Sequence, residues 1–177
     1  MTVMRRSLWI LLQVTLIALV VRGAPAAEQV ALGPTSGLQV PRFVSLKSDR
    51  VNVRGGPTKG NDVTWIYTRA ALPVEVTAEF ENWRRVRDWE GAEGWVYHSL
   101  LSGRRTVIVA ARTKASDELL PLLDRAEAGA VVARLQPGVL GQVRRCTGTW
   151  CRIVGEGFDG WIEQGRLWGV YPNERID

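Results

Sequence analysis

The chain has 177 residues and a formal net charge of +5, with one histidine and two cysteines. These three side chains are fewer than the four ligands of a structural zinc site, so a zinc site made of cysteine and histidine is excluded. No other metal and no cofactor are expected. The length suits one ordinary domain or two small ones.

The N-terminal residues have the pattern of a secretory signal peptide. Two arginines precede an apolar run over residues 8–21, and small residues occupy the positions that a signal peptidase reads. We therefore expect residues 1–26 to be a signal peptide, cleaved after Ala26 or Ala27. The mature protein would be periplasmic or secreted, without stable membrane insertion. An uncleaved anchor is the alternative, but a bilayer span needs roughly 20 residues.

Cleavage would remove three arginines and no acidic residue, which lowers the formal net charge from +5 to +2. A nucleic-acid-binding surface needs a concentrated basic patch. Arg84, Arg85 and Arg87 are interleaved with acidic residues, and this pattern favours a solvated strand face. We expect no nucleic-acid partner. The chain also has eight tryptophans, and such side chains either build cores or form contact surfaces.

Two stretches of the chain repeat each other, residues 74–103 and residues 141–169. Tryptophan, glycine and β-branched residues recur at matching places. The matched pairs are Val76 with Val143, Trp83 with Trp150, Val86 with Ile153, Gly94 with Gly160, Trp95 with Trp161, Val96 with Ile162, Leu101 with Leu167 and Gly103 with Gly169. The chain therefore holds two copies of one unit.

Each copy is predicted to consist of short strands. In the first copy we expect strands over residues 51–53, 63–67, 72–78, 83–87 and 94–97, separated by turn residues. The sequence "HSLLSG" after the last strand indicates a 3₁₀ turn. In the second copy, residues 118–125 could form a helical turn, although Pro121 argues against a long one.

The predicted architecture is all-β, with two small, partly open β-barrels in tandem and short 3₁₀ turns. The predicted boundaries follow from the repeat and from turn residues. They are residues 1–26 for the signal peptide, 27–42 for a flexible leader, 43–105 for the first domain, 106–171 for the second domain and 172–177 for a C-terminal tail.

The motifs resemble those of the bacterial SH3-like domain. The first copy carries "VNVRGGP", "ENW" and "GWV", and the second carries "QPGV", "WC", "GWI" and "LWGVYP". The "VNVRGGP" segment of the second copy is reduced to something like "LLDRAE". The resemblance implies small SH3-like barrels, export, and non-enzymatic binding, often to cell-wall peptidoglycan or peptides. Members are frequently attached to cell-wall hydrolases, but we expect no hydrolase domain in these residues.

The SH3-like fold gives four glycines defined roles. We expect Gly55 and Gly56 to take positive φ in the first long loop. Gly94 and Gly160 should let the last strand pass close to its neighbour. Each of these last two glycines precedes a tryptophan that we expect to pack against its barrel, Trp95 and Trp161.

No catalytic constellation can be assembled from these residues, so we expect no enzyme activity. The single histidine, His98, lies beside Ser99, and neighbours on a turn rarely form a nucleophile and base pair. The carboxylates Asp88, Glu90 and Glu93 precede Gly94, where a solvated turn is favoured over a calcium loop.

Aromatic residues outside the core could form a binding surface. Trp89 is flanked by charged residues at a predicted turn, and Tyr97 ends a strand. Trp65 and Tyr67 share one strand face, where core packing is favoured over ligand contact. Asn52 and Arg54 point to the opposite face from Val53 and could meet a ligand or brace the first loop. The candidate ligand-binding residues are Trp89, Tyr97, Trp65, Tyr67, Asn52 and Arg54.

The two cysteines are the first and last residues of the six-residue segment "CTGTWC". The repeat places this segment on a hairpin. With a two-residue loop at Gly148 and Thr149, Cys146 faces Cys151 across the hairpin, at a Cα separation near 4.5 Å. The aligned positions in the first copy hold the opposite charges of Glu79 and Arg84. We predict a Cys146–Cys151 disulfide, although a β-bulge could shift this register.

Two functions remain open. The first is an exported binding module for cell-wall peptidoglycan or an envelope peptide. The second is a periplasmic scaffold or adaptor for a partner protein, without a glycan ligand and with the "WGVYPNERID" tail as one contact.

Overall fold

The computed structural model describes residues 31–110 and 118–177. The predicted signal peptide and its cleavage site lie outside these residues. Within them, strands dominate, and the helical elements are two single 3₁₀ turns, η1 (His98–Leu100) and η2 (Gln164–Arg166). None of the described helices is long and apolar enough to cross a bilayer.

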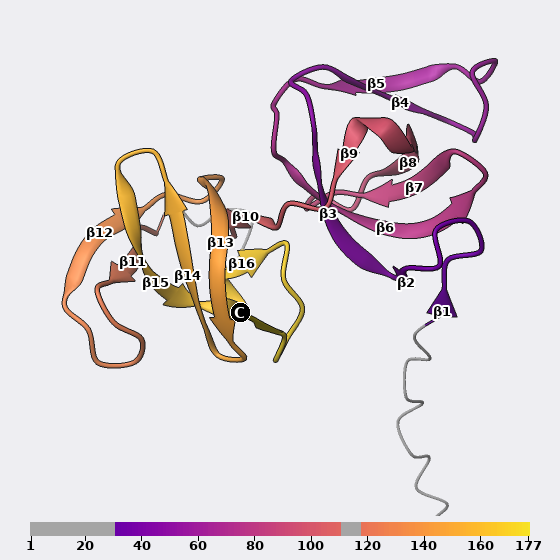
Figure 1. Cartoon of the computed structure of the whole chain (residues 1–177). Coiled ribbons are helices and arrows are strands. Elements are labelled where there is room, and N and C mark those ends of the chain that lie inside the picture. Colours follow the sequence, from indigo (N-terminus) through magenta and orange to yellow (C-terminus); the bar gives the residue numbers. More distant parts are fainter. Residues whose placement is uncertain (1–30, 111–117) are drawn as a thin grey trace, which may run out of the picture.

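The first domain is one antiparallel seven-stranded sheet that curls into a partly open barrel (Figure 1). Its outer strands lie at the rim, and buried and exposed residues alternate in strands such as β4 (Val51–Arg54). In spatial order the strands are β5 (Val63–Tyr67), β4 (Val51–Arg54), β8 (Glu93–Tyr97), β7 (Trp83–Arg87), β6 (Pro73–Phe80), β3 (Arg42–Leu46) and β9 (Leu101–Ser102).

The second domain has the same strand order, so the predicted tandem architecture is confirmed. From one rim to the other, the strands are β12 (Val131–Leu135), β11 (Leu120–Leu123), β15 (Phe158–Glu163), β14 (Trp150–Gly155), β13 (Leu140–Thr147), β10 (Thr106–Val109) and β16 (Leu167–Trp168). A further strand, β17 (Arg175–Ile176), pairs with the end of β13. Two residues of the predicted C-terminal tail, Arg175 and Ile176, are therefore a part of the second sheet.

Residues 120–123 form a strand, and the helical turn considered for this segment is wrong. The burial pattern of β11 alternates like that of β4, with Leu120 and Leu122 buried where β4 buries Val51 and Val53. Leu123 pairs with Trp161 in the way that Arg54 pairs with Trp95. The alternation of leucines, which has the period of a strand, prevails over the helical spacing of the same apolar residues.

The predicted disulfide is present between Cys146 and Cys151, whose Cα atoms are 4.1 Å apart. The two residues are paired across β13 and β14, and Glu79 and Arg84 are paired in the same way across β6 and β7. The expected bulge also exists, but it lies between Val143 and Arg145, with an equivalent between Val76 and Ala78. Because the bulge precedes the cysteines, their register is that of the simple hairpin.

Of the four glycines with predicted roles, two have those roles in the structure and two do not. A Cβ atom at Gly94 would overlap Val53, and one at Gly160 would lie 2.6 Å from the carbonyl oxygen of Leu123, so the expected close strand contacts are confirmed. Gly55 and Gly56 do not have positive φ. Gly56 is instead packed against the Asn61 side chain, which would be 2.6 Å from an added Cβ.

The barrel cores are built mainly from β-branched residues. Trp95 and Trp161 are only half-buried, and the fully buried side chains beside them are Val96 and Ile162. The two tryptophans therefore lie outside the core centre, because strand alternation turns the residue after each of them inward. Trp83 is the buried tryptophan, at 7% exposure.

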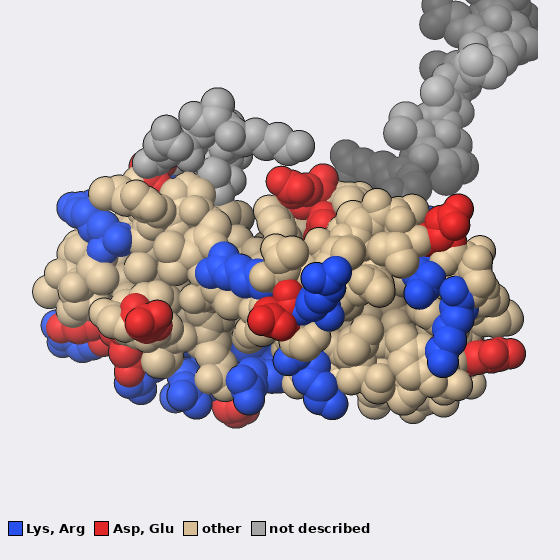
Figure 2. Space-filling view, turned by 90° about the horizontal axis from the view of Figure 1, so that it is seen from above, with Lys and Arg blue, Asp and Glu red and all other residues tan. Residues whose placement is uncertain are grey.

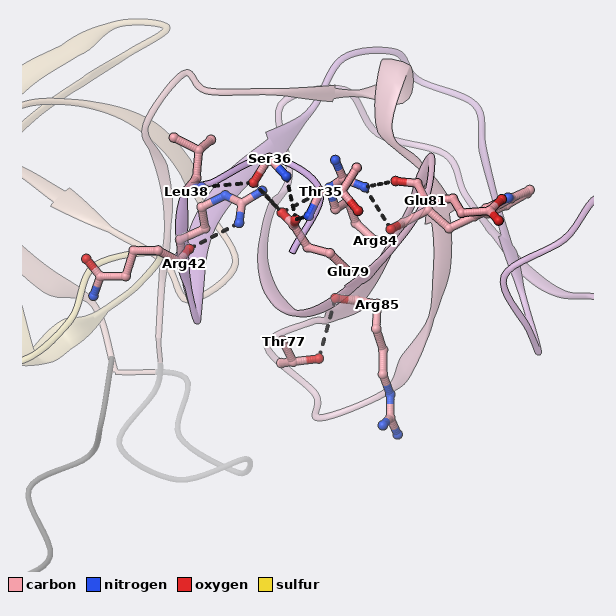
Figure 3. A network of polar contacts seen from close by, with 11 residues as sticks. Thr35, Ser36, Leu38, Arg42, Thr77, Glu79, Glu81, Arg84 and Arg85 are labelled. Atoms are coloured by element: carbon pink, nitrogen blue, oxygen red, sulfur yellow. Dashed lines mark hydrogen bonds and ion pairs between the residues drawn. The ribbon is translucent and has the colours of Figure 1, made fainter. Parts of the chain in front are cut away.

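Residues 31–40 form a hairpin of β1 (Ala31–Leu32) and β2 (Gln39–Val40), where the sequence indicates a flexible leader. The buried carboxylate of Glu79 holds this hairpin (Figure 3). It accepts hydrogen bonds from Ser36 Oγ at 2.6 Å and Ser36 N at 2.9 Å, and it pairs with Arg42 at 2.8 Å and Arg84 at 3.2 Å. The β3 strand then begins at Arg42, one residue before the predicted domain boundary.

The two domains pack against each other through β10, which lies at their boundary (Figure 1). Val107 and Val109 belong to the core of the second domain, whereas Ile108 between them belongs to the core of the first. Side chains of a strand alternate between its faces, so one strand serves both cores. Thr106 Oγ1 also donates a 2.7 Å hydrogen bond to the carbonyl oxygen of Ala71.

A candidate ligand-binding groove between the two domains

A groove of about 800 Å³ lies where the two domains meet. Its size is within the range of small-molecule binding sites, roughly 300–1,000 Å³. The first domain supplies strands β3, β6 and β7, and the second supplies the β13–β14 hairpin tip, η2, β16 and the C-terminal segment. The lining side chains include Phe43, Glu75, Arg87, Trp150, Glu163, Gln164, Trp168, Tyr171 and Asn173.

Phe43 joins the aromatic residues of the groove across the domain boundary. Its ring meets Trp168 edge-on, with centroids 5.1 Å apart, and Tyr171 at 4.7 Å. Such aromatic pairs contribute about 0.5–1.5 kcal/mol beyond their buried area. Phe43 is buried on β3, while Trp168 and Tyr171 are half-buried, so these two rings keep a part of their surface open.

Glu75 is the polar centre of the first-domain wall and is only 3% exposed. Its Oε2 accepts from Arg87 Nε at 2.9 Å, and its Oε1 accepts from the Tyr171 hydroxyl at 2.9 Å. Burial and the charge of Glu75 raise the pKa of Tyr171 above its ordinary value, and the hydrogen bond to Glu75 raises the pKa of Arg87. Tyr171 therefore remains a neutral donor, and the carboxylate is held from both domains.

The C-terminal segment forms the other wall and is fixed by Gln164 and Glu174. Gln164 Nε2 donates to the carbonyl oxygens of Tyr171 at 2.7 Å and Glu174 at 3.0 Å. Glu174 pairs with Arg105 at 2.7 Å and accepts from the Tyr171 backbone N–H at 2.8 Å. Burial disfavours the charged form of Glu174 and would raise its pKa. The hydrogen bonds from Arg105 and from the Tyr171 N–H favour the charged form and outweigh burial, so the pKa of Glu174 is lowered.

Two buried polar atoms of groove-lining residues have no hydrogen-bond partner among the described residues. They are Oε1 of Gln164, an acceptor, and Nε1 of Trp168, a donor. Buried polar groups are nearly always paired, and an unpaired one costs roughly 1–3 kcal/mol. The groove wall therefore contains one unused hydrogen-bond acceptor and one unused donor.

The six candidate residues chosen from the sequence all lie in the first domain, and none of them lines the groove. Trp89 is exposed, as expected, at 41%, and it lines a separate pocket. Tyr97 is half-buried with its ring edge-on to Trp83, at 5.4 Å between centroids. Asn52 is exposed on β4, away from the groove residues.

Trp65, Tyr67 and Arg54 have structural partners. Trp65 and Tyr67 are in an edge-on contact at 6.0 Å, and the Tyr67 hydroxyl donates to the buried Asp88 at 3.0 Å. Burial and Asp88 raise the pKa of Tyr67. Arg54 donates to the Asn61 carbonyl oxygen at 2.6 Å, which braces the first loop as one of the two alternatives predicted.

None of the groove residues of the second domain is among the candidate binding residues chosen from the sequence. Trp150, Trp168 and Tyr171 were treated as repeat anchors or as parts of the tail, and Phe43 and Glu75 carry no motif. The usable signal is the segment "LWGVYP", in which one aromatic residue ends β16 and another follows it, without a counterpart at the same place in the first copy.

Neither of the two cysteines nor the single histidine lines the groove. Both cysteines are in the disulfide, and His98 is exposed on η1, where its ring contacts Tyr97. No group of three or more His, Cys, Asp or Glu side chains that could hold a metal ion occurs within residues 31–110 and 118–177.

Basic and acidic side chains are interspersed over both domains on the face drawn in Figure 2.

The sequence matches the bacterial SH3 domain family over residues 47–103 and again over residues 117–169, which together make up more than half of the chain. The chain belongs to the bacterial SH3 domain family. The two matched segments correspond to the two barrels, so the protein is a tandem bacterial SH3 domain protein.

Two solved structures are similar to this chain, NlpC2 and NlpC1 from Trichomonas vaginalis. The identities are 12% and 14%, with TM-scores of 0.34 and 0.33. The matches cover 74% and 77% of this chain but 49% and 48% of the others, so the chain spans about half the length of these structures. No curated protein matches the sequence.

Proposed function

We propose that this tandem bacterial SH3 domain protein is an exported, non-enzymatic module that binds cell-wall peptidoglycan or an envelope peptide in the groove between its domains. The observation that carries this proposal is the composition of the groove. Aromatic rings that can stack on sugar rings or peptide groups lie beside a buried unpaired donor and a buried unpaired acceptor. Neither domain builds this surface alone.

Family membership and the disulfide support the proposed location and role. Bacterial SH3 domains commonly bind cell-wall material. Disulfides persist in oxidising compartments such as the bacterial periplasm, which agrees with the predicted signal peptide. The pairing of both cysteines and the exposed position of the only histidine support a role in binding rather than catalysis.

A pull-down with purified sacculi tests the proposal. The wild-type protein should co-sediment with sacculi, and Trp150→Ala should weaken this binding up to about tenfold, because the loss of one stacking platform removes about 0.5–1.5 kcal/mol. Phe80→Ala is the matched control, since Phe80 is 48% exposed on β6 and does not line the groove. Circular dichroism of each variant checks that it is folded.

Binding that is equal in Trp150→Ala and wild type would contradict the groove as the site. Absence of any binding to sacculi, together with a partner protein crosslinked in cells, would favour the alternative of a periplasmic scaffold. The contact of the C-terminal segment with Gln164 and Arg105 gives that alternative a defined surface as well.

A further inference from the structure

A second, smaller pocket of about 380 Å³ lies at the domain boundary and contains Trp89. The first domain contributes Trp89 and Glu90, and the second contributes Trp168, Pro137 and the end of β10. Apart from Glu90, every lining residue is apolar or aromatic, or is glycine. Glu90 forms no ion pair with any described residue.

The turn that carries Trp89 and Glu90 is held in place by the buried Asp88. Asp88 Oδ1 accepts from the backbone N–H groups of Glu90 at 3.0 Å and Ala92 at 2.9 Å, while its Oδ2 accepts from the Tyr67 hydroxyl. The Gly91 N–H also donates to the carbonyl oxygen of Asp88 at 3.0 Å. The indole and the carboxylate are therefore presented by a fixed turn, which lowers the ordering cost of binding.

Two indoles and one carboxylate are complementary to an organic cation. The face of an indole attracts ammonium groups, and this attraction grows when the cation is desolvated. The carboxylate of Glu90 supplies the opposite charge at the rim, while Ile108, Val109 and Pro137 offer apolar contact to the carbon atoms of the ligand. A neutral or anionic group would gain only the apolar part of these interactions.

We propose that this pocket binds an organic ammonium group, either a primary alkylammonium, such as that of a lysine-type side chain, or a quaternary ammonium. The site is separate from the groove and stands independently of the function proposed for it, although Trp168 borders both. Its two distinguishing residues are Trp89 and Glu90.

Titration of the full mature chain with tetramethylammonium and with n-butylammonium tests the proposal, followed by the indole N–H signals in ¹H–¹⁵N spectra. At least one of the two cations should bind saturably and shift the Trp89 signal. The matched neutral compounds tert-butanol and n-butanol should bind about tenfold more weakly, because they lack the cation–π contribution. Glu90→Gln should weaken cation binding several-fold and reduce its dependence on salt.

Trp89→Ala should abolish saturable binding, and Trp89→Phe should retain a part of it, which separates loss of the ring from loss of the fold. Phe80→Ala, an exposed aromatic residue outside the pocket, should bind the cations like the wild type. Equal affinity for the cations and the neutral compounds, or unchanged cation binding by folded Trp89→Ala, would overturn the proposal. This titration uses small cations and no sacculi, whereas the groove is tested with sacculi, so failure of one test leaves the other proposal intact.

Discussion

The hydroxyl oxygen of Tyr171 lies 2.9 Å from Oε1 of Glu75, so the segment after the last strand of the second repeat is bonded to the middle of β6 in the first domain. Glu75 is almost fully buried, and its other oxygen pairs with Arg87. A polar contact thus accompanies the packing of Phe43 against Trp168 and Tyr171. Together these contacts set one wall of the groove against the other.

Tyr171→Phe should reduce the free energy of unfolding by about 1–3 kcal/mol, because it leaves one oxygen of a buried carboxylate without its donor. Urea denaturation followed by tryptophan fluorescence measures the change. Tyr97→Phe is the control, since the hydroxyl of this half-buried tyrosine makes no hydrogen bond with a described residue. Equal midpoints for the two variants would show that the Tyr171–Glu75 bond does not stabilise the interface.

Ile108→Ala should destabilise the first domain, although Ile108 belongs to a strand of the second. The side chain is 3% exposed within the first core, and truncation of such a residue costs about 2–5 kcal/mol. Hydrogen exchange should therefore accelerate in β4 and β8. Val107→Ala, whose side chain packs in the second core, should instead accelerate exchange in β11 and β15. Effects confined to the second domain in both variants would refute the shared strand.

Removal of the disulfide with Cys146→Ser and Cys151→Ser should cost about 2 kcal/mol of stability, as expected for a short closed loop. Because Gly148, Thr149 and Trp150 at the tip of this hairpin line the groove, the variant should also bind sacculi more weakly. Mass spectrometry of the purified protein should show a gain of two hydrogens on reduction. Two freely alkylatable thiols in the native protein would contradict the bond.

The stability of the protein should fall as the pH decreases from about 4.5 towards about 2, because of Glu79. Burial alone would raise the pKa of this carboxyl, but hydrogen bonds from Ser36 and Arg42 and the charge of Arg84 lower it from 4.5 to about 2. A carboxyl with a folded-state pKa below its unfolded value stabilises the fold above the unfolded pKa. This contribution is lost as the pH falls through the folded pKa.

Thermal unfolding measured between pH 2 and pH 6 checks this expectation. Glu79→Gln should be less stable than the wild type at pH 6 and should lose less stability than the wild type between pH 4.5 and pH 2. Glu81→Gln, an exposed neighbour, should follow the wild-type curve. A Glu79→Gln curve parallel to that of the wild type would show that the leader hairpin does not depend on the charge of Glu79.

The features that were predicted correctly all arise from local patterns. Alternation of β-branched residues indicated the strands, the spacing of "CTGTWC" around a glycine indicated the hairpin, and the repeat aligned Cys146 with Glu79. Each depends on residues within one or two strands, where backbone geometry determines which side chains face each other. The flexible leader predicted for residues 27–42 shows why local patterns fail: its turn residues suggest a lack of order, but residues 31–40 are held by Glu79, a contact that spans 43 residues of sequence.

The sequence by itself determined the two tandem barrels and the disulfide, because strand periodicity and a repeated motif encode them, whereas the spatial order of the strands came from the structure. Only the tertiary structure decided how the barrels meet. Tyr171 and Glu75 are 96 residues apart, and Ile108 enters a core whose other strands precede it. Periodic sequence patterns do not predict contacts of this kind, because the contacts depend on how two complete sheets are placed relative to each other. For this reason the candidate binding residues chosen from the sequence all lie in one domain, whereas the groove is formed by both.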